Sequence, residues 1–463
     1  MKYSNIEYSI VWFIISIVLC TIKLDNSMFL VHSILVVANI YSYYRCIRIW
    51  VAKGCSYLSL YTFFVFYMCA SNLGQSIVSL IPSSINDLSI YEQFKMDEII
   101  AALKFQLLCV AGFGLGTSIW INRNSIVNKN ILILNYQQID PISFGQQTIL
   151  KVLFILSVVL VSTDALSYLT MRQSMGYMDA YTERQLDGIP IYMQFANWLI
   201  ILLGFYFAFT KRYTKFIIGI FITLILIFLV CGNRSLTIRY LAFLMILNPV
   251  AYPKYFEKKY LIVWSVLGLF FISLLSVISA ARNDVGTALQ YASGQQTVGD
   301  MLMSSLSEMG GSVNTLIYTM DAINKGFNHH LTELYFAITA FSTSQLCYIF
   351  GVGDEFLPLG EWVGEYAGIQ GYGLGYSCVA EWFMNYGWFG CIFAIFYGYF
   401  ITMAECVSYR KIANGNYIES VVLLTFLCSQ IFYARSSMFN SLIDVRFGFW
   451  LIVIYKIIHH KRQ

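Results

Sequence analysis

The feature that most constrains this chain is a series of apolar stretches, each about as long as a bilayer is thick. A membrane-spanning helix needs about 20 predominantly apolar residues. The stretches here are continuous rather than alternating, which excludes the strands of a membrane barrel. We count twelve candidate spans, at about 8–22, 28–44, 57–80, 98–121, 148–168, 191–209, 216–232, 236–252, 260–280, 386–405, 417–434 and 440–457. The sequence therefore predicts an all-α, polytopic membrane bundle of about 12 transmembrane helices.

The composition agrees with a membrane protein and excludes several other classes. Charged residues make up 12% of the 463 residues, whereas soluble domains carry roughly 25%. Net charge is only +4 and no basic patch occurs, so we expect no nucleic-acid partner. The 11 cysteines are scattered singly without a CxxC pair, which predicts buried free thiols rather than a metal site. We expect the first apolar stretch to be a retained helix, because no small-residue cleavage site follows it.

Basic residues in the loops predict the orientation of the spans. With a cytoplasmic N-terminus, 17 Lys and Arg residues fall on the inside and 8 on the outside, and twelve spans bring the C-terminus inside as well. This topology divides the chain into residues 1–280, which hold spans one to nine; 281–385, a large external loop; and 386–463, which hold the last three spans and a basic cytoplasmic tail. Residues 331–350 are apolar but interrupted by polar residues, so we expect amphipathic helices on the outer surface there rather than a span.

One stretch, residues 371–387, combines a glycine-rich turn with a polar helix face. Its glycines stand at every second position, and three polar residues follow at spacing i, i+4 and i+8, which places them on one face of a helix. The residues are Gly371, Gly373 and Gly375, followed by Ser377, Glu381 and Asn385. An acid at the mouth of a membrane helix is costly unless it has a partner or a function. Glu381 is therefore the first candidate for a catalytic residue.

Further charges fall on the predicted outer side, where the basic-residue rule would not place them. They are Arg234, Arg282, Arg435 and Glu308, and they join Glu381 there. Arginine suits phosphate because its planar fork donates paired hydrogen bonds and stays charged. A partly buried glutamate suits a general base. The pattern predicts a site for a lipid pyrophosphate whose bond to a sugar is broken at the outer leaflet.

Structural readings of the same residues stay open. Arg234 could anchor a lipid headgroup, Glu381 could pair with an arginine, and the glycines could form only a tight loop. Arg239 and Arg446 could pair with Asp444 inside the bundle. The shorter external loop carries Tyr177, Tyr181 and Arg184, which could contact sugars, although aromatic residues are common at membrane interfaces.

The chain resembles the bacterial O-antigen and capsule repeat-unit polymerases of the Wzy type. The likeness rests on GNRS at 232–235, ARND at 281–284, SEMGGS at 307–312, GYGLGYSCVAEWFMNYGWFG at 371–390, and Arg435 before the last span. It extends to the topology, with a dozen spans, one large external loop late in the chain and a second loop midway. Each motif alone is short, so their order and shared side of the membrane give the resemblance its weight.

The resemblance implies a metal-independent, glycosyltransferase-C-like enzyme of the cytoplasmic (inner) membrane that needs no cofactor. Such an enzyme moves a growing glycan from undecaprenyl pyrophosphate onto an incoming lipid-linked repeat unit at the outer face, alongside a flippase and a chain-length regulator. Carried onto this chain, Arg234, Arg282 and Arg435 would bind the pyrophosphate. Glu381 would act as the base, with Glu308 as second candidate. The glycan contacts would come from Gly371, Gly373, Gly375, Ser377, Asn385, Tyr177, Tyr181 and Arg184.

Two rival functions share parts of this pattern. An O-antigen ligase would use the same lipid-pyrophosphate site, but a catalytic histidine late in the large loop would favour it, and His329 and His330 lie too early. A flippase or transporter would place polar residues deep in several helices and show an internal repeat. The charges here crowd one side of the bundle, and we find no repeat in the sequence.

Overall fold

A computed structural model of the chain shows an architecture built of helices. It describes residues 5–22, 28–81, 90–123, 144–176, 179–180, 183, 190–209, 213–231, 233–251, 263, 298–327, 359–368, 375–413, 417–443, 446–451 and 453. Within these ranges the regular secondary structure is helical and contains no strand, which confirms the predicted all-α class. The prediction succeeds because a chain in lipid must satisfy its backbone hydrogen bonds internally, and a helix does so within one segment.

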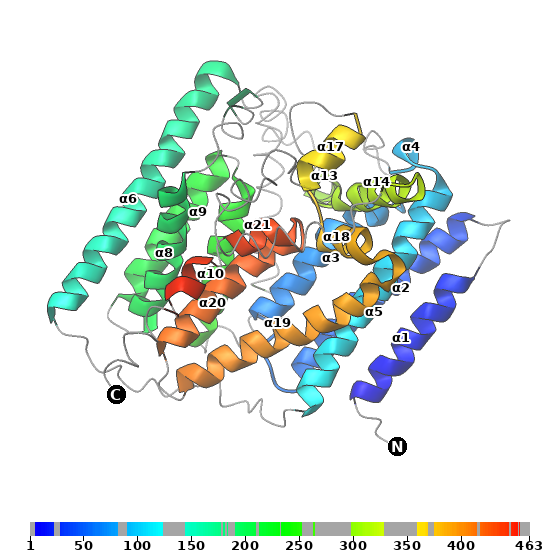
Figure 1. Cartoon of the computed structure of the whole chain (residues 1–463), viewed down its shortest axis with the longest axis horizontal. Coiled ribbons are helices and arrows are strands. Elements are labelled where there is room, and N and C mark those ends of the chain that lie inside the picture. The colour runs from blue at the N-terminus through cyan, green and yellow to red at the C-terminus, as the bar shows by residue number, and fades with distance from the viewer. Residues whose placement is uncertain are drawn as a thin grey trace. The chain divides into compact units, whose positions relative to one another are not determined.

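Figure 1 labels the helices along the chain, and most of the longer ones lie in apolar stretches of the sequence. In chain order they are α1 (Asn5–Thr21), α2 (Met28–Ala52), α3 (Leu60–Val78), α4 (Ile90–Gln93), α5 (Met96–Arg123), α6 (Phe144–Met175), α8 (Ile191–Phe209), α9 (Thr214–Cys231), α10 (Arg234–Ala251), α13 (Val298–Met309), α14 (Ser312–Asn324), α17 (Leu359–Tyr366), α18 (Cys378–Tyr386), the 3-10 turn η5 (Gly387–Phe389), α19 (Gly390–Ala413), α20 (Tyr417–Tyr433) and α21 (Met438–Ile443).

Five helical segments of the described chain are long and apolar enough to cross a membrane. They are Met96–Arg123, Gln147–Met175, Ile191–Phe209, Thr214–Cys231 and Cys378–Ile412, and shorter apolar helices occupy Asn5–Thr21, Ser235–Leu247 and Ile418–Tyr433. The total of about twelve spans and the sidedness of the loops stay predictions. The expected span at 260–280 lies outside the described residues except for Val263, and the 331–350 segment lies wholly outside them.

The chain forms two compact units, each assembled from separate stretches. One unit contains residues 1–129, 302–406 and 433–443, and the other contains residues 130–301, 407–432 and 444–463. The first unit therefore joins the N-terminal helices to the parts of the chain around Glu308, Glu381 and Arg435. The boundaries at 280 and 385, which delimit the expected large external loop, describe membrane topology rather than compact units. They stay a prediction.

In the first unit, α5 packs against α1 and α2, and α14 packs against α3, α5, α17 and α18. Small residues let α5 and α19 approach closely. A side chain at Gly116 would collide with the carbonyl oxygen of Ile395, and one at Gly398 would collide with the carbonyl oxygen of Phe113. Such small-residue contacts replace the hydrophobic driving force that helices lack in lipid.

In the second unit, α8, α9 and α10 pack against one another, and α6 lies against α8 and α9. Aromatic rings fill the space between these helices: Phe221 stacks on Phe243 at 3.7 Å between ring centroids, and Phe205 lies 4.4 Å from the same ring. A side chain at Gly204 would meet the rings of Phe221 and Phe243. The glycine therefore makes room for this aromatic cluster.

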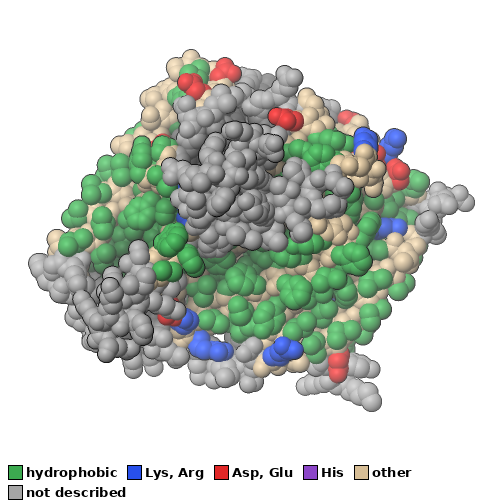
Figure 2. Space-filling model, in the orientation of Figure 1, with side chains coloured by type: hydrophobic (Ala, Val, Ile, Leu, Met, Phe, Trp, Pro, Cys, Tyr) green, Lys and Arg blue, Asp and Glu red, His purple; other side chains and the backbone are tan. Residues whose placement is uncertain are grey.

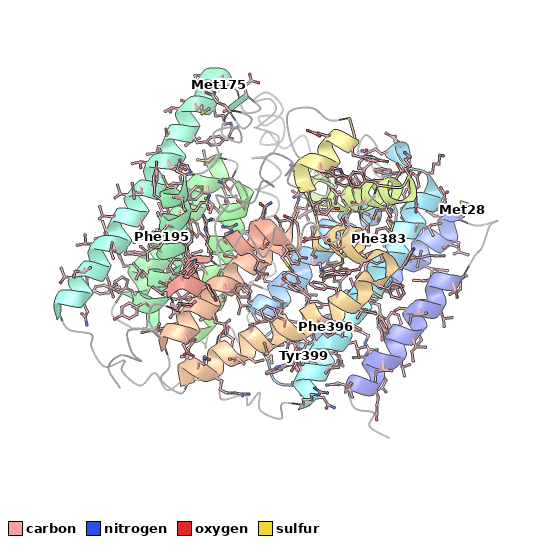
Figure 3. All side chains as sticks on the ribbon, in the orientation of Figure 1. Met28, Met175, Phe195, Phe383, Phe396 and Tyr399 are labelled. Carbon is pink, nitrogen blue, oxygen red and sulfur yellow. The ribbon has the colours of Figure 1, made fainter. Side chains whose placement is uncertain are left out.

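Several helices expose continuous apolar faces. On α19, Ile392, Phe396 and Phe400 recur at i, i+4 and i+8 with exposed fractions of 46%, 66% and 36%. Figure 2 shows hydrophobic side chains spread over this helix, and Figure 3 labels Phe396 on it. A continuous exposed apolar face of this kind is unfavourable in water and suits lipid.

Candidate functional site

The glycine-rich stretch leads into α18, and Ser377 begins that helix. Ser377 has an extended backbone, and its hydroxyl accepts a hydrogen bond from the backbone N–H of Ala380 at 3.1 Å. Ser377 is therefore the N-cap and stands outside the helical face on which its spacing had placed it. Gly375, just before, has φ of +76°, a backbone conformation that favours glycine. The helix ends at Tyr386 because Gly387 also adopts positive φ, which turns the chain into α19.

Glu381 lies in α18 with only 3% of its surface exposed. Its Oε2 accepts a hydrogen bond from the backbone N–H of Met438, the first residue of α21, at 2.7 Å. Asn385, one turn further along, donates from Nδ2 to the backbone carbonyl of Glu381 at 3.0 Å, and its own Oδ1 is buried without a partner. The predicted acid is thus buried and held by a helix N-terminus, where negative charge is favoured.

Arg435 lies in the turn that connects α20 to α21. Its Nη2 donates to the backbone carbonyl of Glu308 at 3.4 Å. Glu308 stands at the end of α13, two residues before the turn at Gly310 and Gly311. This contact joins the SEMGGS motif to the turn before α21. The first residue of α21 is the one that donates a hydrogen bond to Glu381.

Helix α3 contacts two turns, the one that follows α13 and the one that connects α20 to α21. A side chain at Gly74 would collide with the carbonyl oxygen of Leu306, and one at Gly310 would collide with the backbone nitrogen of Gln75. On the same helix, Asn72 donates from Nδ2 to the carbonyl of Ala434 at 3.4 Å. Backbone-to-backbone packing therefore fixes residues 306–310, which are the end of α13 and the start of the turn after it and are called the 306–310 turn below, against α3. A side-chain amide bonds the 434–436 turn to the same helix.

Buried aromatic and hydroxyl contacts complete the arrangement. Trp382 donates from Nε1 to the hydroxyl of Tyr433 at 3.1 Å, which bonds α18 to the end of α20. Phe383, labelled in Figure 3, packs edge-on against Phe105 of α5 at 4.9 Å between ring centroids. Tyr376 shares a hydrogen bond of 2.7 Å with Thr319 of α14. We call the assembly of α3, the 306–310 turn, α18 and the 433–438 segment the junction.

The junction brings together three of the five charged residues predicted for the site, Glu308, Glu381 and Arg435. Asn385 also belongs to it through α18, Ser377 caps that helix, and Gly375 stands two residues before the cap. Arg234 is the first residue of α10 in the second unit, and its side chain is not among those described. The remaining predicted residues, Arg282, Gly371, Gly373, Tyr177, Tyr181 and Arg184, lie outside the described residues.

The tight turn before Arg234 has a local cause. Helix α9 ends at Cys231, and Asn233 accepts at Oδ1 from the backbone N–H of Leu236 at 3.2 Å. This Asn cap starts α10 immediately after α9. Deeper in the second unit, Arg446 donates to Oε1 of Gln194 at 2.7 Å. The proposed pairing with Asp444 falls on a residue outside the described part.

Sequence reasoning missed the polar face of α3 and the acid Glu405. Asn72, Gln75 and Ser76 are all less than 10% exposed. Glu405 in α19 is fully buried, and its Oε2 accepts from the backbone N–H of Tyr61, in the first turn of α3, at 2.8 Å. The signal was present in the sequence: polar residues at i, i+3 and i+4 inside an apolar span, and a single acid in another.

The described side chains contain no group of three or more His, Cys, Asp or Glu residues placed to hold a metal ion. Metal independence itself stays a prediction.

The fold and the junction define a polytopic helical membrane protein with charged and polar groups buried among its helices. The chain belongs to the O-antigen polysaccharide polymerase Wzy family, whose model matches residues 6–462, nearly the whole length. No curated protein and no solved structure matches it significantly. Family membership makes this an inner-membrane polysaccharide polymerase of the O-antigen type that acts on lipid-linked oligosaccharide repeat units.

Proposed function

We propose that this polymerase transfers the growing glycan from undecaprenyl pyrophosphate onto an incoming lipid-linked repeat unit at the outer face of the membrane. In this proposal Glu381 is the general base and Arg435 binds the pyrophosphate. The observation that supports it is that Arg435 and the hydrogen-bond partner of Glu381 belong to one short segment, residues 435–438. The Glu381 carboxylate is bonded to Met438, and Arg435 stands three residues earlier on the same segment.

The chemistry requires one bond to form and one to break. The acceptor hydroxyl oxygen attacks the anomeric carbon of the donor glycan, and the bond from that carbon to the pyrophosphate oxygen breaks with its electrons. The hydroxyl proton passes to Glu381, and undecaprenyl pyrophosphate leaves as the anion. Arg435 stabilises the charge that develops on the leaving group, since a fixed cation in a water-poor site acts without reorganisation.

The local structure suits these roles. The hydrogen bond from Met438 fixes the orientation of the Glu381 carboxylate. Arg435 belongs to a turn that Asn72 of α3 also contacts, through the carbonyl of Ala434. Glu308 contacts Arg435 through its backbone carbonyl and is the second candidate for the base. Arg234 and Arg282 remain candidates for pyrophosphate binding on the strength of the sequence.

The test is polymerisation by the purified protein in nanodiscs. Lipid-linked repeat units, extracted from cells that lack this gene, are added, and the products are separated on a gel. We expect a ladder of longer lipid-linked glycans and release of undecaprenyl pyrophosphate. Glu381→Gln should abolish the ladder in a folded protein, whereas Glu365→Gln, on an exposed residue of α17, should leave it intact.

Other outcomes would replace the proposal. Transfer of the glycan to a different acceptor, without a ladder, would assign the ligase reaction. Movement of the lipid-linked unit between leaflets without any new glycosidic bond would assign a flippase. A full ladder from Glu381→Gln would remove Glu381 as the base and direct attention to Glu308.

A further inference from the structure

The C-terminal half of α3 carries buried hydrogen-bond acceptors that have no partner among the described residues. Asn72 Oδ1, Gln75 Oε1 and Ser76 Oγ have no partner, although their residues are only 1%, 6% and 0% exposed. Ser307, in the motif that packs against this helix, is also buried with an unpartnered hydroxyl. A buried polar group without a partner costs free energy, so a ligand that supplies partners would bind such a cluster favourably.

Comparison with other buried hydroxyls of the unit sets these residues apart. Ser42, Thr117 and Thr402 each donate to the carbonyl four residues earlier, which satisfies them within their own helix. Ser76 and Ser307 make no such bond. The orientation of Asn72 is also fixed, because its Nδ2 donates to the carbonyls of Met68 at 3.0 Å and Ala434 at 3.4 Å.

The unsatisfied atoms belong to the junction. Gly74 of α3 contacts Gly310. In the sequence Gly74 stands between Asn72 and Gln75, and Gly310 stands three residues after Ser307. The residues Asn72, Gln75 and Ser76 stand at i, i+3 and i+4 and therefore share one face of α3. The turn that holds Arg435 is bonded to the same helix through Ala434. A single ligand bound here would meet acceptors from α3 beside a guanidinium.

This combination restricts the chemistry of the ligand. The Asn and Gln oxygens can only accept hydrogen bonds, so the ligand must present donors. Phosphate oxygens and lipid tails offer none, whereas sugar hydroxyls and acetamido N–H groups do. A glycan joined to pyrophosphate carries both the donors and the anion for Arg435.

We infer that the polar face of α3, through Gln75 and Ser76 with Ser307, binds hydroxyl or acetamido groups of the sugar nearest the pyrophosphate. The inference rests on the proposed function and adds residues that determine glycan recognition. Asn72 acts as a positioning residue, because its amide also holds the Arg435 turn.

Binding is the first readout, so the inference is tested whether or not the protein polymerises. The probes are the lipid-linked repeat unit from cells lacking this gene and undecaprenyl pyrophosphate without a glycan, each titrated against protein in nanodiscs. We expect Gln75→Met and Ser76→Ala to weaken binding of the lipid-linked unit about tenfold for each hydrogen bond lost. Binding of undecaprenyl pyrophosphate should not change. The KM for the lipid-linked unit should rise with kcat retained.

Matched controls separate recognition from folding. Gln106→Met changes an equally buried glutamine on α5, outside the junction, and should leave both affinities unchanged. Ser76→Ala removes one oxygen atom only, so it remains informative if Gln75→Met fails to fold. Unchanged affinity for the lipid-linked unit in Ser76→Ala and in folded Gln75→Met would overturn the inference, as would parallel loss of undecaprenyl pyrophosphate binding. A wild-type protein that binds the unit but builds no ladder would instead overturn the proposed function.

Discussion

The carboxylate of Glu381 accepts a hydrogen bond from the backbone N–H of Met438 at 2.7 Å, and so joins α18 to the first residue of α21. This bond gives Glu381 two separable roles. As an acceptor it satisfies a helix N-terminus that would otherwise lack a partner. In the proposed reaction its carboxylate takes the proton of the acceptor hydroxyl.

Substitution at Glu381 should separate these roles. Glu381→Gln keeps an oxygen that can accept from Met438, so we expect a melting temperature near that of the wild type. Its polymerisation rate should fall by about 10²- to 10⁴-fold, the usual contribution of a general base. Glu381→Leu should lose the activity and also about 1–3 kcal/mol of stability, because it leaves the Met438 N–H unpaired. Thermal melts and ladder assays on both variants measure the two effects.

Glu405 offers a matched control for that experiment. It is also a buried glutamate whose Oε2 accepts from a backbone N–H in the first turn of a helix, that of Tyr61 in α3. Glu405→Gln should therefore keep both stability and the ladder. An equal loss of activity in Glu405→Gln would mean that a buried carboxyl group in general, rather than a base at Glu381, is what the enzyme requires.

The planar fork of Arg435 should matter beyond its charge. Arg435→Lys keeps the cation but cannot form paired hydrogen bonds to a pyrophosphate, so we expect roughly a 10- to 100-fold loss of turnover. Arg435→Ala should lose more, since the leaving-group charge is then unopposed. Ladder formation and the affinity for undecaprenyl pyrophosphate report both changes. Arg123→Lys, at the exposed end of α5, is the control. Wild-type turnover in Arg435→Lys would exclude bidentate binding at this residue.

The features that were predicted from the sequence are those that depend on residues close together along the chain. Apolar stretches predicted helices, and the spacing of Glu381 and Asn385 predicted a shared helix. Ser377 was placed on that helix although it is the N-cap, since spacing alone does not reveal where a helix begins. The capping role of a serine before the first turn becomes visible only with the backbone.

Hydrogen bonds between residues far apart along the chain could not be predicted from the sequence. The hydrogen bond between Glu381 and Met438 joins residues separated by 57 positions, and the one from Asn72 to Ala434 spans 362. No local periodicity encodes these contacts. The polar residues of α3 were visible in the sequence, but their meaning depends on the Gly74–Gly310 contact that places α13 beside them.

That contact makes a prediction about the SEMGGS motif. Gly310→Ala should be strongly destabilising, because its new methyl group would collide with the backbone nitrogen of Gln75 rather than with a movable side chain. Overpacking typically costs about 1–3 kcal/mol, and we expect the upper end or beyond here. The neighbouring Gly311 is the control: a methyl group there would meet the Glu308 carbonyl oxygen at an ordinary 3.6 Å. Thermal melts of Gly310→Ala and Gly311→Ala that coincide would contradict the close approach of α3 and the 306–310 turn.

The contact between α14 and α17 should depend on pH. Asp321 on α14 accepts hydrogen bonds from Lys325 Nζ at 2.6 Å and from the Tyr366 hydroxyl of α17 at 2.8 Å. The bond from Lys325 is the main cause that holds the pKa of Asp321 below its ordinary value of 3.8. Because the folded pKa is lower than the unfolded one, the stabilisation is complete at neutral pH. It is lost only as the pH falls below about 4 and through the folded pKa.

Hydrogen exchange of α17 can measure this dependence. In Asp321→Asn at pH 7 the Tyr366 hydroxyl of α17 donates to a neutral amide oxygen instead of a carboxylate, so we expect lower amide protection factors in α17 than in the wild type. The effect should be small, because the pair is largely exposed to solvent. The difference between the two proteins should shrink as the pH falls from 7 to 3, because the wild-type carboxyl loses its charge as the pH approaches its folded pKa. A difference that persists unchanged at pH 3 would mean that the Asn side chain disturbs α17 for a reason other than charge, and that the ion pair contributes nothing to this contact.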